Sequence, residues 1–510
     1  MYMTMKRYRF QIALGFSFAA LLVTGCRVGP VYHKPPAMVQ APPAEYKESP
    51  AQHPESNAWQ VAQPQDAMLH GKWWEIYGDP DLNALEDKLN VDNQTIRQSF
   101  ENFMAARTLI AQARAQLYPT LTAAPSATRS GGSANQSSTS SLIVPGNRSS
   151  SLMTLGADAS WAPDLWGRVR NLIREQQYNA QVSAADLENV RLTEQATLAL
   201  TYFEIRGQDA LQSVYTQTVA DDQKALDYTR AQYETGVGQE ISVVEAQNTL
   251  ESAQATFTGV GVARAEYEHA IATLTGQDAS AFSIPVKPLD AAPPAIPIGV
   301  PSQLLERRPD IAAAERTMAS ANAAIGVATA AYYPNLTLSA NGGLESAALQ
   351  HLFDISSRFW SIGASASETI FDAGLRRAAV NQTIDVYNGD VASYRETVLT
   401  AFQQVEDYLA GVRILSQQIQ QEQQAAASAQ RFVDLETARY QTGLDPYIDV
   451  VTAQNTLLAD EQTLSTLHTQ AMTASVQLIE ALGGGWDSTQ LPTPAQVSQR
   501  QSPAKTAMDR

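Results

Sequence analysis

The sequence predicts a mainly α-helical protein with a small β component, folded from two copies of one unit. Three observations predict this fold class: short motifs that recur 207 residues apart, four segments that alternate apolar and polar residues, and two helical stretches of about 67 residues. An α-helix rises 1.5 Å per residue, so each long stretch would extend about 100 Å. Rods of that length do not fit inside a compact domain, and we therefore expect an elongated molecule.

The first 25 residues have the pattern of a lipoprotein signal peptide. Basic residues precede an apolar stretch over 12–23, which ends in small residues directly before Cys26. This order predicts cleavage after residue 25 and covalent attachment of lipid to the Cys26 thiol. Because Cys26 is the only cysteine, disulfides and cysteine-based metal sites are excluded. Arg27 follows where lipoproteins kept at the inner membrane commonly carry aspartate, which favours the outer membrane.

The net charge and the hydropathy of the chain limit its possible partners and the kind of membrane-spanning element it can contain. The formal net charge is −17, which argues against nucleic acid as a partner. After the signal peptide, no segment reaches the ~20 consecutive apolar residues that a transmembrane helix requires. Any part of the mature chain that crosses a membrane is therefore expected to be β.

The recurring motifs define the domain organisation. Residues 246–250 (AQNTL) return at 453–457, just after the turns at Gly236 and Gly443, so the chain is an internal duplication. The expected units are a signal peptide (1–25), a Pro-rich extended N-terminal segment (26–64), a first repeat (57–284), a Pro-rich connector (285–309), a second repeat (302–485) and a disordered polar tail (486–510).

Each repeat contains one predicted β-hairpin, over 118–164 and over 333–372. Residues 335–341 (NLTLSAN) and 360–367 (WSIGASAS) alternate strictly, and residues 153–161 do so in the first repeat. Strands of about ten residues with one apolar and one polar face are typical of membrane β-strands, although a soluble sandwich is an alternative. Four strands cannot close a membrane barrel, so the barrel must be shared between several chains.

The helices of each repeat are predicted to form a hairpin. One long helix, over 165–235 or 374–440, lies against two shorter helices placed end to end. The shorter helices are expected over 81–117 and 240–276 in the first repeat, and over 302–332 and 446–483 in the second. From Val398 to Ile419 the apolar residues follow the alternating spacing of four and three that is typical of a coiled-coil seam. A plain amphipathic helix is the alternative, but the length of the pattern argues against it.

Several motifs together point to a known family. Residues 300–311 (VPSQLLERRPDI) lie between the repeats, residues 164–168 (DLWGR) precede the first long helix, and Trp73-Trp74 opens the first repeat. With the tip motifs, these resemble the TolC-like outer-membrane efflux proteins, in particular their NodT-type lipoprotein branch. The resemblance implies a trimeric α/β-barrel channel, in which each chain of a homotrimer gives four transmembrane β-strands and long coiled-coil helices.

The resemblance also implies a function and partners. Such a protein would be the exit duct of a tripartite multidrug or toxic-compound efflux pump, anchored by lipid in the cell outer membrane and extending into the periplasm. Its expected partners are a periplasmic adaptor protein, an inner-membrane proton-driven pump of the resistance-nodulation-division class and outer-membrane lipid. Apart from the lipid on Cys26, no cofactor is expected.

The resemblance places an acidic periplasmic gate at the second tip. Asp449 matches an aspartate that closes the tunnel in family members, and threefold symmetry would repeat it as a ring of carboxylates. Asp445 is a further acidic candidate, and Tyr440 matches a tyrosine that latches the closed state. Thr452 stands where members often carry another aspartate, which leaves a second acidic ring open. Pro446 distinguishes this tip from the first, so the second hairpin is the expected mobile one.

No catalytic pattern is present in the sequence. The six histidines are scattered without the spacing of a zinc site, and no phosphate-binding glycine loop occurs. We therefore expect neither an enzyme nor a metal site. The same fold could also serve as a duct for protein secretion or metal-ion efflux, and a periplasmic coiled-coil scaffold without a pore is a further alternative.

Overall fold

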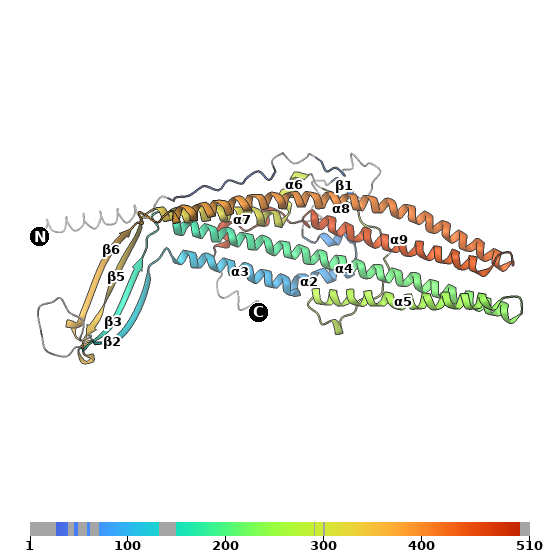
Figure 1. Cartoon of the computed structure of the whole chain (residues 1–510), viewed down its shortest axis with the longest axis horizontal. Helices are drawn as coiled ribbons and strands as arrows, with labels where there is room; N and C mark the ends of the chain where they lie inside the picture. Colours follow the sequence, from blue (N-terminus) through green and yellow to red (C-terminus); the bar gives the residue numbers. More distant parts are fainter. Residues whose placement is uncertain are drawn as a thin grey trace.

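The computed structural model shows an elongated molecule with a β-sheet at one end and two helical tips at the other (Figure 1). It describes residues 27–38, 45–48, 59–61, 71–131, 149–289, 291–298 and 301–499. Between the two ends, helices from both repeats run side by side along the long axis. None of the helices within these ranges combines the length and the apolar content that a membrane-spanning helix needs.

The four longer strands form one antiparallel sheet. Their order is β2-β3-β5-β6, so the hairpins of the two repeats meet between β3 and β5. Trp161 pairs with Leu338 there, and Ala159 with Ala340, which places the apolar residues of both repeats on one face. β2 and β6 are the edge strands of this sheet. The strands are β2 (Thr120–Gly131), β3 (Ser149–Trp161), β5 (Asn335–Ser346) and β6 (Arg358–Ser367).

Two helices of 67 residues, α4 and α8, form the backbone of the rod. At 1.5 Å per residue each is about 100 Å long. In each repeat the long helix packs against shorter helices that together match its length. The helices are α2 (Pro80–Asp92), α3 (Gln94–Ala115), α4 (Arg168–Glu234), α5 (Glu240–Leu274), α6 (Pro301–Arg307), α7 (Pro309–Thr329), α8 (Leu375–Gln441), α9 (Tyr447–Ala481) and α10 (Pro494–Val497).

Both long helices begin in the same way. Gly167 precedes α4 and Gly374 precedes α8, and both adopt the left-handed conformation, with φ of +76° and +91°. Just upstream, Asp164 or Asp372 accepts hydrogen bonds from backbone N–H groups of the first turn and pairs with an arginine on that turn. A carboxylate here satisfies otherwise unpaired N–H groups and interacts favourably with the helix dipole.

Two of the expected shorter helices are interrupted. The helix expected over 81–117 breaks at Asn93, whose side-chain oxygen accepts from the Ile96 N–H at 2.9 Å and whose amide donates to the Leu274 carbonyl at 2.9 Å. The helix expected over 302–332 breaks before Pro309, which becomes the first residue of α7. Proline has no N–H and suits the first turn of a new helix.

The main apolar core lies in the middle of the rod. Trp73 and Trp74 are fully buried there, and the Trp73 indole donates to the Gln195 side chain at 3.2 Å. The seam predicted on α8 faces this core: its residues from Val398 to Val412 are buried, except Phe402, which is partly buried. Ile419 extends the buried line toward the tip.

The motif between the repeats joins three helices. Arg308 donates to the last carbonyl of α9, that of Ala481, at 2.9 Å and to Gln404 on α8 at 2.9 Å. It also pairs with Asp310 in the first turn of α7 at 2.6 Å. The motif therefore fixes α7 against the end of α9 and the side of α8.

The connector is fastened to the first repeat by buried charges. The Asp209 carboxylate is fully buried and accepts from Arg206 at 3.1 Å, from Arg264 at 2.6 Å and from the Lys287 backbone N–H at 2.9 Å. Arg206 also donates to the Pro285 carbonyl at 2.7 Å. Nearby, β4 (Ile296–Ile298) pairs in parallel with β1 (Trp59–Val61), so the N-terminal segment and the connector meet in one small sheet.

The expectation of a disordered tail over 486–510 is wrong for residues 486–499. Trp486 is buried, and the short helix α10 places Val497 in a cluster with Ile110 and Ala180. Arg107 on α3 donates to two carbonyls of this segment, and glutamines on α4 donate to others. Composition misled the prediction, because polar side chains of α3 and α4 bind the backbone of this segment. Residues 500–510 lie outside the described residues.

Short 3₁₀ helices complete the described structure. They mark turns and chain ends, and η2 also places Trp73 and Trp74 in the main core. They are η2 (Trp73–Tyr77), η3 (Ala279–Ala281), η4 (Ala330–Tyr332), η5 (Leu349–His351), η6 (Ile355–Ser357) and η7 (Ser488–Gln490).

Candidate gate at the helical tips

Each helical hairpin reverses at a glycine. Gly236 between α4 and α5 has φ of +76°, and Gly443 between α8 and α9 has φ of +74°. The Gly443 N–H donates to the Tyr440 carbonyl at 2.9 Å, and the Leu444 N–H donates to the Arg439 carbonyl at 3.0 Å. These bonds satisfy the last carbonyls of α8, and the left-handed turn favours glycine. Both residues thus lie where the sequence predicts the tip turns.

The second tip brings three carboxyl groups together. Glu436 on α8, Asp445 in the turn and Asp449 in the first turn of α9 each offer an oxygen within 4.8 Å of the others. The sequence predicts Asp445 and Asp449 but not Glu436. Its signal is positional: residues at equal distances before and after Gly443 face each other across the hairpin, and residue 436 lies seven before it while residue 449 lies six after it.

The three carboxyl groups differ in their surroundings. Asp445 forms an ion pair with Arg439, with the Arg439 Nη2 donating to Asp445 Oδ1 at 2.9 Å. The hydrogen bond and charge of Arg439 lower the pKa of Asp445. Desolvation and the neighbouring carboxylates of Asp445 and Asp449 raise the pKa of Glu436. The negative charge that Arg439 does not directly pair therefore lies on Glu436 and Asp449.

Tyr440 connects the two hairpins. Its hydroxyl donates to the Gln232 side chain on α4 at 2.6 Å. Its ring lies 6.0 Å from that of Tyr228 on α4 and 5.2 Å from that of Tyr447 on α9. Tyr447 is buried in an apolar cluster that spans both hairpins and includes Val450. The sequence predicts Tyr440 as a latch, but its partner Gln232 carries no motif that could have identified it.

Thr452 contributes no charge to this site. It is exposed on α9, and its hydroxyl donates to the Ile448 carbonyl one turn earlier at 2.8 Å. The acidic cluster is therefore confined to the turn and the helix ends next to it.

A polar cavity lies beside this site, between α4, α5 and α9. It has a volume of about 320 Å³. Asp222 on α4 and Val451 on α9 both line it, and Val451 also belongs to the cluster around Tyr447. Burial, followed by the charge of Asp221, raises the pKa of Asp222 to about 6.

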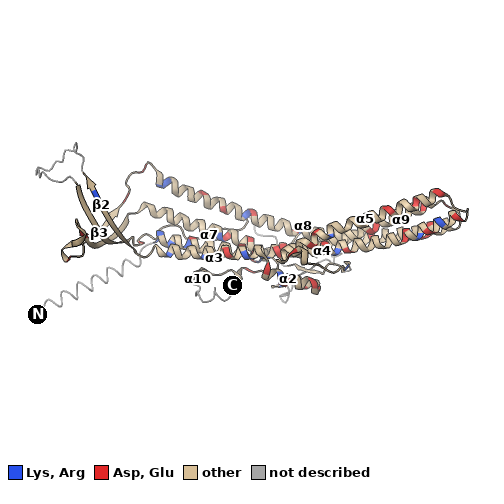
Figure 2. Cartoon of the chain, turned by 90° about the horizontal axis from the view of Figure 1, so that it is seen from below, with Lys and Arg blue, Asp and Glu red and all other residues tan. Residues whose placement is uncertain are grey.

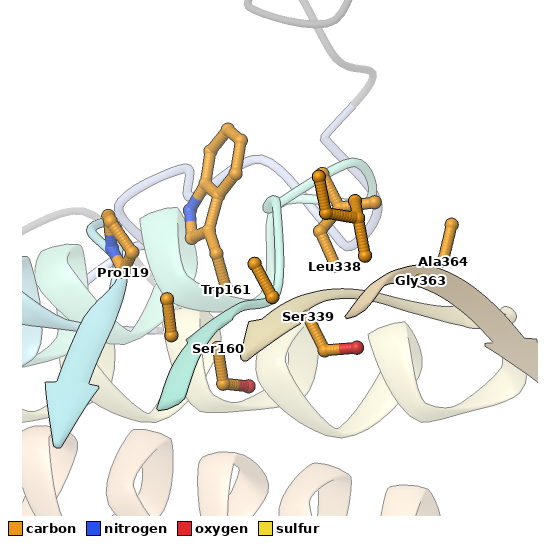
Figure 3. A pocket seen from close by; sticks show the side chains of 10 residues that line it. Pro119, Ser160, Trp161, Leu338, Ser339, Gly363 and Ala364 are labelled. Atoms are coloured by element: carbon orange, nitrogen blue, oxygen red, sulfur yellow. The ribbon is translucent and has the colours of Figure 1, made fainter. Parts of the chain in front are cut away.

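The opposite end of the molecule has a different chemistry. Figure 2 shows acidic residues in red along α5, α9 and the tips, whereas most of the sheet is tan. In Figure 3, Trp161, Leu338 and Ala364 point to one side of the sheet, and Ser160 and Ser339 point to the other. The apolar side holds a shallow hollow of about 390 Å³. The alternation in the sequence thus produces one apolar and one polar face.

The N-terminal segment begins at the foot of this sheet. Cys26 lies outside the described residues, but Arg27 packs against Gly167. The Val28 N–H donates to the Trp166 carbonyl at 3.1 Å, and Asn171 donates to the Val28 carbonyl at 2.8 Å. The residue that follows Cys26 is therefore held at the junction between β3 and α4.

Comparison with known proteins places this architecture in a family. The profile of the outer membrane efflux protein family matches residues 85–277 and 300–484, which cover both repeats. The chain belongs to the outer membrane efflux protein family. The resemblance predicted from residues 300–311 and the other motifs is thereby confirmed.

Individual family members are similar over nearly the whole chain. The probable efflux pump outer membrane protein TtgC of Pseudomonas putida is 30% identical over 93% of this chain and 95% of its own. The outer membrane protein OprJ of Pseudomonas aeruginosa is 30% identical over 92% and 96%. Among solved structures, the outer-membrane channel OprN superposes with a TM-score of 0.80 at 26% identity, over 90% of this chain and all of that one. The outer membrane protein VceC of Vibrio cholerae gives 0.73 at 27% identity, over 82% and 99%.

These relatives establish the general role of the chain. It is an outer-membrane efflux protein with the fold of the outer-membrane channels. The cell outer membrane is therefore the location of this protein.

Proposed function

We propose that three copies of this chain form the exit duct of a tripartite efflux pump, closed at the helical tips by the acidic cluster and the Tyr440 contact. The observation that carries the proposal is the fastening of the charged second tip to the first hairpin through Tyr440 and Gln232. A movable charged tip held by one hydrogen bond and a small apolar cluster suits a gate that a partner can open.

Assembly as a homotrimer is supported by the surfaces that one copy leaves uncovered. The edge strands β2 and β6 end the sheet on both sides, and edge strands pair readily with another chain. Ile370, Phe371 and Leu375 are 95%, 85% and 71% exposed where the sheet joins α8. In the proposed trimer, neighbouring sheets join edge to edge, and other copies or lipid cover these side chains.

A lipid anchor on Cys26 is supported by the position of the segment that follows it. Arg27 and Val28 are bound at the junction of β3 and α4, next to the apolar sheet face. Lipid attached one residue earlier would therefore enter the bilayer at the level of the sheet. This geometry agrees with the signal peptide pattern over residues 1–25.

The proposed partners are a periplasmic adaptor protein and a proton-driven pump of the inner membrane. The chain itself provides a passage, and no covalent bond is made or broken in it. Relatives carry the names toluene efflux pump and antibiotic efflux pump outer membrane proteins. We infer that this duct likewise carries apolar toxic compounds, with selection left to the pump.

The gate is tested by single-channel conductance of the purified protein in a planar bilayer. Tyr440→Phe removes one hydrogen bond, worth about 1 kcal/mol, and should shift each tip about fivefold toward the open state. Asp449→Ala removes charge from the cluster and should raise the open-channel conductance. Tyr233→Phe is the matched control, because Tyr233 is the equivalent of Tyr440 in the first repeat and is exposed.

The same recording separates the gate from the alternatives. Conductance that is unchanged in both Tyr440→Phe and Asp449→Ala would remove these residues from the gate. A protein that assembles as a trimer but conducts in none of the variants would support the scaffold without a pore.

A further inference from the structure

The polar cavity between α4, α5 and α9 is separate from the acidic cluster of the gate. It lies about three helical turns from Gln232, on the side away from the tip. Residues from all three helices line it, so both hairpins contribute to its wall. The lining includes Tyr215, Thr218, Asp222, Asn248, Thr249 and Gln454.

Two side-chain oxygens in the lining are buried without a partner. Asp222 is 3% exposed, and its Oδ2 accepts no hydrogen bond from any described residue. The side-chain oxygen of Gln454, across the cavity on α9, is likewise buried and unpaired within the described part of the chain. A buried charged oxygen without a partner is costly, so the pair indicates a missing ligand.

Two threonine hydroxyls in the wall add acceptors rather than donors. Thr218 donates its proton to the Val214 carbonyl at 3.0 Å, and Thr249 donates to the Glu245 carbonyl at 3.0 Å. Each hydroxyl has only one proton, so both present lone pairs to other neighbours. A cavity that offers a carboxylate, an amide oxygen and hydroxyl lone pairs suits a bound cation better than a bound anion or a ligand that only accepts hydrogen bonds.

Most of the charges around the cavity are negative. Asp221 precedes Asp222 on α4, Glu245 lies on α5 and Glu461 lies on α9. The nearby Lys224 is bound to Asp221 at 2.8 Å. The local field is therefore negative and attracts cations toward the cavity.

We propose that this cavity binds a hard divalent cation of the Ca²⁺ type, with the Asp222 carboxylate and the Gln454 amide oxygen as ligands from the two hairpins. Ca²⁺ accepts six to eight oxygen ligands, including carboxylates, amide carbonyls and waters, in flexible geometry. The cavity is large enough to keep several waters on the ion. A single carboxylate in the first shell gives weak binding, with a Kd of about 10⁻⁴ to 10⁻³ M.

The cation would join the first hairpin to α9 further from the tip than the contact between Tyr440 and Gln232. Bound Ca²⁺ therefore stabilises the packing of α9 against α4 and α5. This inference does not depend on the gate, because neither Asp222 nor Gln454 belongs to the acidic cluster at the tip.

The test uses the full-length protein in detergent, titrated with Ca²⁺ by calorimetry and with Tb³⁺, an ion of similar size whose luminescence is excited through nearby tyrosines such as Tyr215. Asp222→Asn keeps the shape of the side chain and should weaken binding at least about tenfold. Gln454→Met, which removes the amide oxygen at similar volume, should also weaken it, and it serves if Asp222→Asn folds poorly.

Two controls separate this site from other acidic groups. Asp227→Asn removes an exposed carboxylate from the same helix, and Asp449→Asn removes one from the tip cluster. Both should keep the Tyr-sensitised Tb³⁺ signal that Ca²⁺ displaces. A signal that survives Asp222→Asn, or that disappears in Asp449→Asn, would assign the ion to another site and overturn the proposal. Absence of any saturable binding would show that the cavity holds water or a proton only, and would overturn it as well.

Discussion

Single acidic residues near the tips lie in different surroundings. Asp222 is almost fully buried beside the cavity, while Asp445 is neutralised by Arg439. Glu436 and Asp449 form no such ion pair with any described residue, and they share one small space. The behaviour of this region therefore depends on pH and on ions more than that of the apolar core does.

The buried Asp222 makes stability fall as pH rises. Burial raises its pKa to about 6 from the ordinary 3.8, so the folded protein holds a proton that the unfolded chain releases between these values. The contribution of this carboxyl to the free energy of unfolding is fully present below about pH 4. It is lost as the pH rises through about 6, and the loss amounts to about 3 kcal/mol. We therefore expect the melting temperature of Asp222→Asn, measured with a chelator present, to rise relative to that of the wild type when the pH is raised from about 5 to about 7.5.

Circular dichroism melts at both pH values measure this difference. Asp227→Asn is the control, because that exposed carboxylate should change the curves little at either pH. If the melting temperatures of the wild type and of Asp222→Asn changed equally with pH, the pKa of the Asp222 carboxyl would not be raised in the folded protein.

The sequence identifies candidate residues where a motif exists, but not where a contact joins helices that are far apart in the chain. Tyr440 belongs to the tip motif that repeats across the chain, and Asp449 is expected from the family resemblance; both lie at the second tip, and their roles in a gate stay predictions. Gln232 and Asp222 have no such signature, because their roles arise only when α4 packs beside α8 and α9. Glu436 is an intermediate case, since counting across the hairpin turn would have found it.

At the scale of helices, α4 and α9 of the two repeats pack tightly at one glycine. Gly207 on α4 faces Thr469 on α9, and a Cβ at Gly207 would lie 2.8 Å from the Thr469 Cγ2 and closer still to its hydroxyl. Glycine is therefore required here by space rather than by backbone conformation. The contact sets how closely the first hairpin lies against the second.

Gly207→Ala should push α4 and α9 apart. We expect a loss of about 1–3 kcal/mol of stability, as for other overpacked sites. Adding Thr469→Ala should recover part of this loss, because the remaining Cβ would still lie 3.1 Å away. Denaturant or thermal melts of the single and double variants measure the coupling.

A glycine with open space provides the control. A Cβ added at Gly259 on α5 would meet no neighbouring atom within 4 Å in a single copy of the chain. Gly259→Ala should therefore stabilise the helix by up to about 1 kcal/mol. Equal effects of alanine at positions 207 and 259 would contradict a steric role for Gly207.

Helix lengths are more predictable than helix breaks. The two 67-residue helices follow from uninterrupted patterns and from tip glycines at both ends of the duplication. The break at Asn93 has a local signal, because asparagine favours the N-cap, but its amide also binds the Leu274 carbonyl, 181 residues away in sequence. The order of residues 486–499 depends on α3 and α4, so local composition cannot reveal it.

At the scale of the whole molecule, chemistry is separated along the long axis. The sheet with its apolar face lies at one end, the mixed core lies in the middle and the acidic tips lie at the other end (Figures 1 and 2). The N-terminal segment starts at the sheet and runs toward the middle, where Glu48 pairs with Arg413 at 2.7 Å. An anchor at the start of this segment and a gate at the tips would therefore act at opposite ends.

Lipid attachment at Cys26 predicts a specific loss on mutation. Cys26→Ala should abolish incorporation of labelled palmitate in cells, because the thiol is the acceptor and no other cysteine exists. Cys26→Ser is a second variant that keeps the size of the side chain and should also fail. Labelled wild-type protein should be found in the outer-membrane fraction, and labelling that persists in both variants would rule out Cys26 as the attachment site.

The packing of the C-terminal segment fixes where an added label can go. Gln177 on α4 holds Ser498, and from there α4 runs on for about 85 Å to its end at Glu234. The 11 residues after Gln499 span at most about 40 Å even when fully extended. A fluorophore or affinity tag attached to Arg510 would therefore stay beside the sheet-side half of the rod. Surface capture through such a tag would leave the acidic tips facing the solution, free to be presented to soluble proteins.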